Sequence, residues 1–218
     1  MFTQEDKSAD FFKVIKNSEL IHNHPIDKEI VHKWNDSQVV IGDIHKIDSV
    51  DVNQYFNIDD MNSVFYGVAY PNFDCGICFD HPLDHLPLMM IFEMGRQFGI
   101  AVSHKFYDIP LTGYINIADS LSFNFKNFLE LDKPIYIVCV DSDVKEKKGI
   151  HRRIMHLAFL QEGVHCASGG GHISVFKKSL YSRMRTASRS KVIDEKVTDV
   201  SSIPTNVDIA QLLFQEAI

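Results

Sequence analysis

One long stretch of the chain is apolar on almost every side of a predicted helix. It runs from Asp84 to Lys105 and reads DHLPLMMIFEMGRQFGIAVSHK. Apolar residues recur too often here for any side of the helix to face bulk water over most of its length. Asp84 is expected to cap the helix, and Pro87 suits a first turn, where its missing N–H has no partner to lose. The rest of the fold is therefore expected to wrap around this helix.

Several stretches on both sides of the helix show the alternation or the short β-branched runs that are typical of strands. They are 38–47, 63–70, 115–125, 134–140, 151–160 and 172–181. The segment 173–184 is long enough for a terminal strand or a hairpin partner. One long helix followed by four or so antiparallel strands predicts an α+β fold, with an antiparallel sheet curled around one long central helix.

The two ends of the chain differ from its middle in composition. Residues 1–28 mix charges with a short apolar cluster and predict an N-terminal extension with at most one amphipathic helix. Residues 29–182 carry the helix and strand signals and form the predicted domain. Residues 183–218 predict a C-terminal linker, polar and turn-rich over 186–205, and then a short helix that Asn206 can cap.

Composition and charge narrow the classes of function. The net charge of −7 argues against general nucleic-acid binding, which needs a concentrated basic surface. No run of about 18 apolar residues is present, so no membrane span is expected. The N-terminus lacks the pattern of a secretory signal, and 4 Cys in 218 residues are too few for a disulfide scaffold. We therefore expect a cytoplasmic protein with free thiols.

Three polar residues stand out in the apolar helix: Glu93, Arg96 and Gln97 lie three and four residues apart and share one face, with His104 further along it. A buried carboxylate and guanidinium are costly unless they pair, form hydrogen bonds or meet a polar ligand. Two interpretations follow. The group is a structural ion pair or a stripe at a subunit contact, or it is a catalytic or ligand-orienting pair in a hydrophobic tunnel.

The segments around this helix resemble those of the A-factor biosynthesis hotdog family, the AfsA-like proteins. The resemblance rests on residues 31–33 (VHK), 70–71 (YP), 81–87 (HPLDHLP) and 93–97 (EMGRQ). That family typically shows an Asp-His-x-Pro-Gly-Met turn before a helix with Glu-Ala-Ala-Arg-Gln. The resemblance covers about residues 29–182 and implies a hotdog fold. Leu88 stands where the family usually has Gly, and one domain is found where well-known members carry two, which implies a homodimer.

The resemblance also implies an activity. It points to an acyltransferase or condensing enzyme that joins a β-ketoacyl thioester, carried by acyl carrier protein or acyl-CoA, to a dihydroxyacetone phosphate-like acceptor in γ-butyrolactone-type signal biosynthesis. No cofactor is implied. The expected catalytic residues are Glu93, Arg96 and His85, and the expected substrate-binding residues are Gln97, His81, Pro87, Leu88 and Met89. A hotdog dehydratase or thioesterase, or a non-catalytic acyl-ligand-binding protein, remain alternatives.

The roles expected for the start of the helix, Glu93 and Arg96 have a physical basis. Backbone amides beyond Pro87, at the positive end of the helix dipole, would polarise the thioester carbonyl. Glu93 would accept the proton of the attacking hydroxyl, with a pKa raised by its apolar surroundings. Arg96 would hold phosphate or a developing oxyanion, or would orient Glu93.

Three other patterns in the sequence suggest sites or turns. Cys75, Cys78, His81 and His85 form a C-x2-C-x2-H-x3-H string, but zinc sites normally separate their ligand pairs with an element, so no metal is predicted. The run Gly169 to Gly171 predicts a turn or bulge. A basic run is either a solvated strand edge or a docking surface for acyl carrier protein; it contains Lys177, Lys178, Arg183, Arg185, Arg189 and Lys191.

Overall fold

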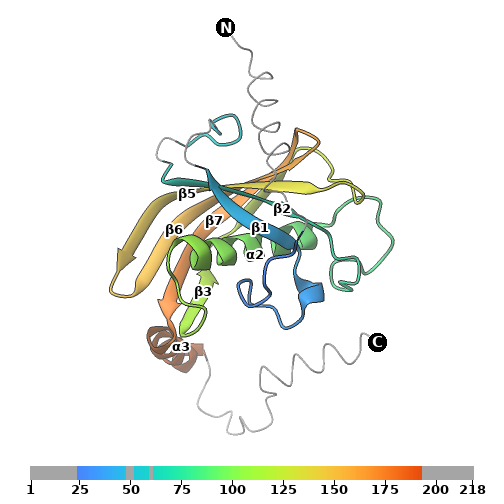
Figure 1. The fold of residues 1–218 in the computed structure, drawn as a ribbon. Helices are drawn as coiled ribbons and strands as arrows, with labels where there is room; N and C mark the ends of the chain where they lie inside the picture. Colours follow the sequence, from blue (N-terminus) through green and yellow to red (C-terminus); the bar gives the residue numbers. More distant parts are fainter. Residues whose placement is uncertain (1–23, 48–51, 59–60, 193–218) are drawn as a thin grey trace. The chain divides into compact units, whose positions relative to one another are not determined.

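The computed structural model describes residues 24–47, 52–58 and 61–192, and it divides into a unit that ends at Lys177 and a second unit that begins at Lys178. The first unit is built from one antiparallel sheet and one long helix (Figure 1). Its elements are η1 (Asp36–Gln38), β1 (Ile41–Ile47), β2 (Ser63–Ala69), α2 (Leu88–Phe106), β3 (Tyr114–Ala118), β4 (Ser122–Phe125), β5 (Ile135–Lys147), β6 (Ile150–Gln161) and β7 (Val164–Lys177). In the second unit, α3 spans Lys178–Val192.

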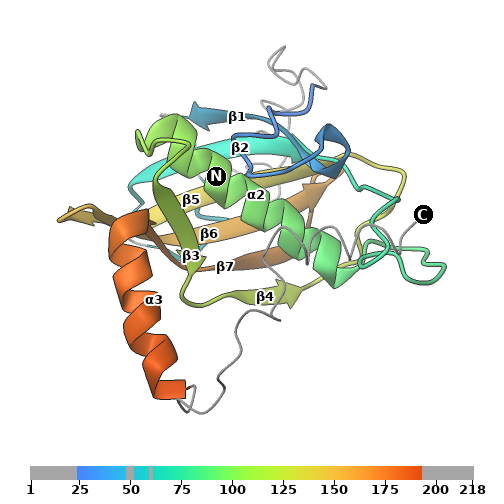
Figure 2. The ribbon, with the colours of Figure 1, turned by 90° about the horizontal axis from the view of Figure 1, so that it is seen from below.

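The strands form a single curved sheet in the order β1-β2-β5-β6-β7, with β3 and β4 paired one after the other along the outer edge of β7. Helix α2 runs across the concave face of this sheet, as Figures 1 and 2 show from two directions. The predicted α+β plan, a sheet curled around one long helix, is confirmed. Among the described residues, no helix is both long and apolar enough to cross a membrane.

Two tight turns set the register of the three longest strands. Lys148 and Gly149 join β5 to β6, and Glu162 and Gly163 join β6 to β7; all four residues have positive φ. Two consecutive residues with positive φ form the type of hairpin turn whose twist matches that of the flanking strands. The predicted strands 134–140 and 151–160 are thus parts of two longer hairpin strands.

The centre of the sheet is covered on both faces, which explains the continuous apolar run PIYIVCV in β5. Ile135, Ile137 and Cys139 pack in the core beneath α2, together with Met94 and Phe98. The alternate residues of β5 pack in a second core on the convex face, which residues from the segment 52–58 help to cover. Alternation along a strand sends successive side chains to opposite faces, so a strand buried on both faces is apolar throughout.

Three expectations are wrong. The segment 173–184 is not one strand, since β7 ends at Lys177 and α3 begins at Lys178; α3 also takes in residues 186–192 of the predicted linker. Gly169 to Gly171 form neither a turn nor a bulge, because they lie inside β7 with unbroken pairing to β6. A Cβ at Gly169 would lie 2.5 Å from the ring of Phe123, so these glycines let the crossing chain approach closely.

The third error concerns the start of the helix. Pro87 is the N-cap of α2, no side chain caps this end, and Asp84 bonds to His85 instead. Three expectations concern residues outside the described ones. They are the helix within residues 1–28, residues 193–205 of the linker and the short helix after Asn206.

Candidate functional site

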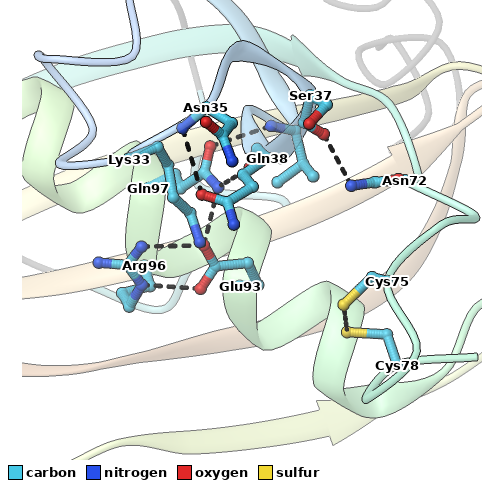
Figure 3. Close-up of polar contacts among 11 residues, drawn as sticks. Lys33, Asn35, Ser37, Gln38, Asn72, Cys75, Cys78, Glu93, Arg96 and Gln97 are labelled. Atoms are coloured by element: carbon cyan, nitrogen blue, oxygen red, sulfur yellow. Dashed lines mark hydrogen bonds and ion pairs between the residues drawn. The ribbon is translucent and has the colours of Figure 1, made fainter. Parts of the chain in front are cut away.

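Glu93 lies at the centre of a charged network on α2. Its Oε2 accepts a hydrogen bond of 2.7 Å from Nε of Arg96, and its Oε1 accepts one of 2.9 Å from Nη2 of the same guanidinium. Oε1 also accepts a hydrogen bond of 2.7 Å from Nε2 of Gln97 and lies 2.8 Å from Nζ of Lys33 (Figure 3). The side chains of Lys33, Glu93 and Arg96 are 21%, 22% and 36% exposed. The network therefore lies at the protein surface but is shielded from most of the solvent.

The pKa of Glu93 is opposite to the expectation. Burial by itself raises the pKa of this carboxyl group, but hydrogen bonds and charge from Arg96, together with Lys33 and Gln97, outweigh burial and lower the pKa to about 2. The expected raised pKa is wrong, because the sequence pattern gave weight to the apolar neighbours and did not reveal Lys33 as a second cation beside Arg96. Glu93 is an ionised and fully engaged carboxylate in this structure.

Gln97 joins the network to the segment that precedes β1. Its buried side-chain amide donates to the Gln38 carbonyl at 2.8 Å as well as to Glu93, and its Oε1 accepts from the Val40 N–H at 3.0 Å. These partners fix the orientation of the amide, since the oxygen must face the N–H and the nitrogen must face the two acceptors. Gln97 thus ties Glu93 to the backbone of residues 38–40.

Arg96 also borders an apolar cavity of about 190 Å³ between α2 and strands β3, β4, β6 and β7, called here the α2 cavity. Apolar side chains dominate its wall, including Phe92, Ile117, Phe123 and Leu157. Two helical glycines, Gly95 and Gly99, also line the cavity and let α2 lie close to β6: added Cβ atoms there would lie 2.9 Å from Leu157 and 2.8 Å from Met155. Glu93 does not line the cavity, so Arg96 is the member of the network that meets both the carboxylate and the apolar space.

A second hollow of about 470 Å³, the N-terminal pocket, lies at the start of α2. His85, Leu88, Ile91, Phe125 and Phe128 are among its lining residues. The Leu86 N–H donates to the Leu129 carbonyl at 2.8 Å, and this bond holds the segment before the helix in place. Because α2 has no side-chain cap, the positive end of its dipole lies beside this pocket without a side-chain acceptor.

The remaining expected site residues are placed as follows. His85 lines the N-terminal pocket, bonds Asp84 at 2.7 Å and contacts the ring of Phe128. Leu88 lines the same pocket, and Leu88 and Met89 are both about half exposed. His81 pairs with Asp80 at 2.6 Å and lines neither hollow. In the described part of the chain, no group of His, Cys, Asp and Glu side chains is arranged to hold a metal ion.

A histidine pair extends the polar face of α2. Nε2 of His32 and Nε2 of His104 lie 2.9 Å apart, and Nδ1 of His104 donates to the Ile109 carbonyl at 2.7 Å when it carries the proton. Burial and the neighbouring charges of His104 and Arg96 lower the pKa of His32. At most one ring of the pair carries a proton on the shared Nε2–Nε2 contact, because two donors cannot bond to one another.

Lys33 is the residue that helical spacing missed. It lies far from Glu93 in the sequence and reaches the network from the loop before η1. The only indication of Lys33 in the sequence was the VHK segment at residues 31–33. This segment resembles the family, but the resemblance implied no role for Lys33. Both His32 and Lys33 of that segment contact the same face of α2, through His104 and Glu93.

The curved sheet around one helix, with a charged network and an apolar cavity on that helix, defines a protein of the hotdog fold. The model of the A-factor biosynthesis hotdog domain (AfsA) matches residues 16–177. This match spans most of the chain, and the protein therefore belongs to this family. No match is found among curated protein sequences.

Similar solved structures include a hot-dog-like protein from Thermanaerovibrio acidaminovorans, with 12% identity and a TM-score of 0.46, covering 65% of this chain and 98% of that one. A putative thioesterase from Lactococcus lactis has 12% identity and a TM-score of 0.43, covering 65% and 96%. A mutant thioesterase from Pseudomonas aeruginosa has 9% identity and a TM-score of 0.39, covering 62% and 81%.

Proposed function

We propose that this protein is an acyltransferase or condensing enzyme that moves a β-ketoacyl group from a thioester of acyl carrier protein or CoA to a phosphorylated hydroxyl acceptor of the dihydroxyacetone phosphate class. The observation that carries the proposal is the position of Arg96, which contacts the Glu93 carboxylate and also borders the apolar α2 cavity. A site that joins an apolar cavity to a few converging polar groups suits a ligand with an apolar chain and a polar head group. Membership of the family supports the same activity.

The acyl donor uses the two hollows along α2. Its thioester lies in the N-terminal pocket, where the amides of the first helical turn and the helix dipole stabilise negative charge that develops on the carbonyl oxygen. Its acyl chain lies against the apolar wall of the α2 cavity. The ring centroids of Phe92 and Phe123, which both line the α2 cavity, are 5.6 Å apart, and Phe123 stacks at 6.5 Å on Phe125, which lines the N-terminal pocket.

The acceptor uses the charge of the network. Lys33 and Arg96 face a single carboxylate, which leaves one net positive charge to attract a phosphate. A phosphate that binds Lys33 or Arg96 competes with the Glu93 carboxylate for that cation, so Glu93 loses one of its charged partners. With fewer cations around it, the carboxylate has a higher pKa and accepts the proton of the acceptor hydroxyl more readily. In this way acceptor binding itself activates the base, which is too weak at a pKa of about 2.

The experiment measures transfer from a β-ketoacyl carrier protein to dihydroxyacetone phosphate by mass spectrometry. We expect Glu93→Gln to lower the rate by about 10²-fold, the usual scale for loss of a general base. Arg96→Lys keeps the charge but loses the two-point contact with Glu93, and we expect a loss of about tenfold. Glu146→Gln and Arg152→Lys, on the exposed β5–β6 hairpin, are matched controls and retain the full rate. Normal rates in both site variants would refute the proposal.

A non-catalytic acyl-binding protein is the second candidate, and the low pKa of Glu93 is the observation that favours it. In that case the acyl ligand binds the α2 cavity and no product forms at any acceptor concentration. A hydrolysed or dehydrated product that forms without a phosphorylated acceptor would instead indicate a thioesterase or dehydratase. The same mass spectra distinguish these outcomes.

We also propose that two copies form a homodimer through a sheet edge. The outer edge made by β3 and β4 pairs with β7 on one side, and in this chain its other side carries no described strand. Free strand edges readily pair with another chain. Analytical ultracentrifugation tests this: Ile117→Pro, within β3, should shift a dimer toward monomer, whereas a wild-type monomer at all concentrations would contradict the proposal.

A further inference from the structure

Two cysteines in the loop between β2 and α2 lie in near contact. The N–H groups of Cys78 and Phe79 donate to the Cys75 carbonyl at 2.9 and 2.8 Å, so one helical turn separates the thiols. The Sγ atoms of Cys75 and Cys78 are 3.0 Å apart (Figure 3). A disulfide needs about 2.05 Å between the sulfurs. A shift of about 1 Å therefore closes the bond, and the one-turn spacing already points both side chains at each other.

The pair differs from the other two cysteines. Cys139 lies within β5, and Cys166 within β7; both are buried. Cys78 is also buried, but Cys75 is partly exposed and is the one of the four cysteines that is not buried. Burial and the adjoining Cys75 raise the pKa of Cys78 to about 12. While Cys75 is free, the Cys78 thiol keeps its proton, so Cys75 is the sulfur that meets the oxidant first.

The loop that carries the pair is tied to the Glu93 network. The side-chain amide of Asn72 donates to the Ser37 carbonyl at 2.7 Å and also accepts from the Asp74 N–H at 3.0 Å. Ser37 belongs to η1, whose last residue, Gln38, accepts from Gln97 at 2.8 Å. Figure 3 shows the bond from Asn72 to Ser37 and the bonds of Gln97 to Gln38 and Glu93, with the two thiols in the same loop as Asn72.

We propose that Cys75 and Cys78 are a redox-active dithiol that closes to a disulfide by exchange with a small-molecule disulfide and thereby stiffens the loop beside Glu93. The Cys75 thiolate attacks one sulfur of R–S–S–R, which forms a mixed disulfide and releases one R–S⁻ that takes a proton. Cys78 then loses its proton to water and attacks Sγ of Cys75, and a second R–SH leaves. Two protein thiols are oxidised and one small disulfide is reduced. The proposal does not depend on the acyl-transfer activity.

The test equilibrates the full-length protein in mixtures of reduced and oxidised glutathione. An alkylating agent then blocks the free thiols, and mass spectrometry measures the mass of the protein. We expect two of the 4 thiols to escape alkylation together, so that the trapped protein carries two fewer alkyl groups and is about 2 Da lighter before alkyl groups are counted, and dithiothreitol to restore both thiols. Peptide mapping should join Cys75 to Cys78. Four free thiols at every glutathione ratio, or a mixed disulfide that accumulates without ring closure, would overturn the proposal.

Variants assign the roles of the two sulfurs. Cys78→Ser should stop at the mixed disulfide on Cys75, and Cys75→Ser should retain its remaining thiols. Cys166→Ser is the matched control and should still lose two thiols together. For the stiffening, amide exchange at Val40, which bonds to Gln97, should slow about tenfold in the oxidised protein. Equal exchange in the two forms would show that the disulfide does not reach the network.

Discussion

Nζ of Lys33 lies 2.8 Å from Oε1 of Glu93, and this contact joins the loop before η1 to the middle of α2. Arg96 and Gln97 reach Glu93 from the next turn of its own helix, whereas Lys33 comes from a separate segment. The pKa of Glu93 therefore depends on the position of that loop as well as on Arg96. A ligand that draws Lys33 away would raise the pKa of Glu93 without touching α2.

Removing the Lys33 charge should raise the pKa of Glu93. In Lys33→Met we expect the pKa to move from about 2 part of the way toward the ordinary 4.5, because Arg96 and Gln97 still bond the carboxylate. Carbon-detected NMR titration of the Glu93 carboxyl group measures the change. Lys28→Met is the control, since Lys28 pairs with the exposed Asp36 at 3.2 Å. An unchanged Glu93 pKa in Lys33→Met would show that the ion pair between Lys33 and Glu93 does not lower this pKa in solution.

The parts of the fold that local pattern encodes could be predicted from the sequence. The all-round apolar run fixed α2, and spacings of three and four brought Glu93, Arg96 and Gln97 to one face. Contacts between distant segments could not be predicted in this way: the Lys33 ion pair and the Val40 hydrogen bond to Gln97 depend on how the loop before β1 crosses the helix. Without Lys33, the apolar neighbours of Glu93 suggested the wrong direction of its pKa shift.

Two errors in the elements have the same cause. Apolar residues continue from β7 into Leu180 and Tyr181, so alternation alone did not reveal that a helix begins at Lys178. A run of three glycines usually marks a turn, but here Phe123 and the backbone of Ser120 press against β7 and require residues without a Cβ. The spacing of apolar residues along the chain therefore reveals neither the start of α3 nor the contacts of Phe123 and Ser120 with the glycines of β7.

The Glu93 network should make stability depend on pH in the acid range. The pKa of Glu93 is lowered in the folded state, so its stabilisation is fully present above about 4.5 and is lost as the pH falls toward about 2. The full shift corresponds to about 3 kcal/mol. We expect Glu93→Gln to be less stable than wild type at pH 7 and the gap to close between pH 4.5 and 2. Urea unfolding across this range measures the gap.

Glu146→Gln is the matched control for this experiment, because Glu146 is exposed on the β5–β6 hairpin. Its stability should follow that of the wild type at every pH. A gap between Glu93→Gln and wild type that stays constant from pH 7 to 2 would mean that the carboxylate does not titrate with the low pKa.

The two helical glycines should respond differently to an added methyl group. A Cβ at Gly95 would lie 2.9 Å from Cδ1 of the buried Leu157, so Gly95→Ala forces a packed side chain to move and should cost about 1–3 kcal/mol. At Gly99 the close atom is Sδ of Met155, at 2.8 Å, and the flexible thioether can turn aside. The helix also favours Ala over Gly by about 1 kcal/mol.

We therefore expect Gly99→Ala to be within about 1 kcal/mol of wild type and Gly95→Ala to be clearly less stable. Urea titrations of the two variants and the wild type give the free energies of unfolding for this comparison. Both substitutions also narrow the α2 cavity, so each should weaken binding of long acyl chains more than of short ones. A larger loss of stability at Gly99 than at Gly95 would contradict the assigned packing.

Arg153 anchors the C-terminal half of α2 from the sheet. Its guanidinium lies 3.0 Å from Asp141, with both side chains fully buried, and donates to Ser103 Oγ at 3.0 Å and to the Gly99 carbonyl at 2.6 Å. Removing one member of a buried pair leaves an unpaired charge, so Arg153→Met should cost about 3–5 kcal/mol. Arg152→Met, one residue earlier and exposed, should change stability by no more than about 0.5 kcal/mol.

The double variant Asp141→Leu/Arg153→Met separates charge from packing. It removes both charges, so it should be more stable than Arg153→Met alone, although the Gly99 carbonyl and Ser103 lose a donor. Urea unfolding of the four proteins, wild type included, gives the coupling between the two sites. If the double variant is no more stable than Arg153→Met, the loss comes from the bonds to α2 rather than from the stranded charge of Asp141, and the anchor acts through the helix.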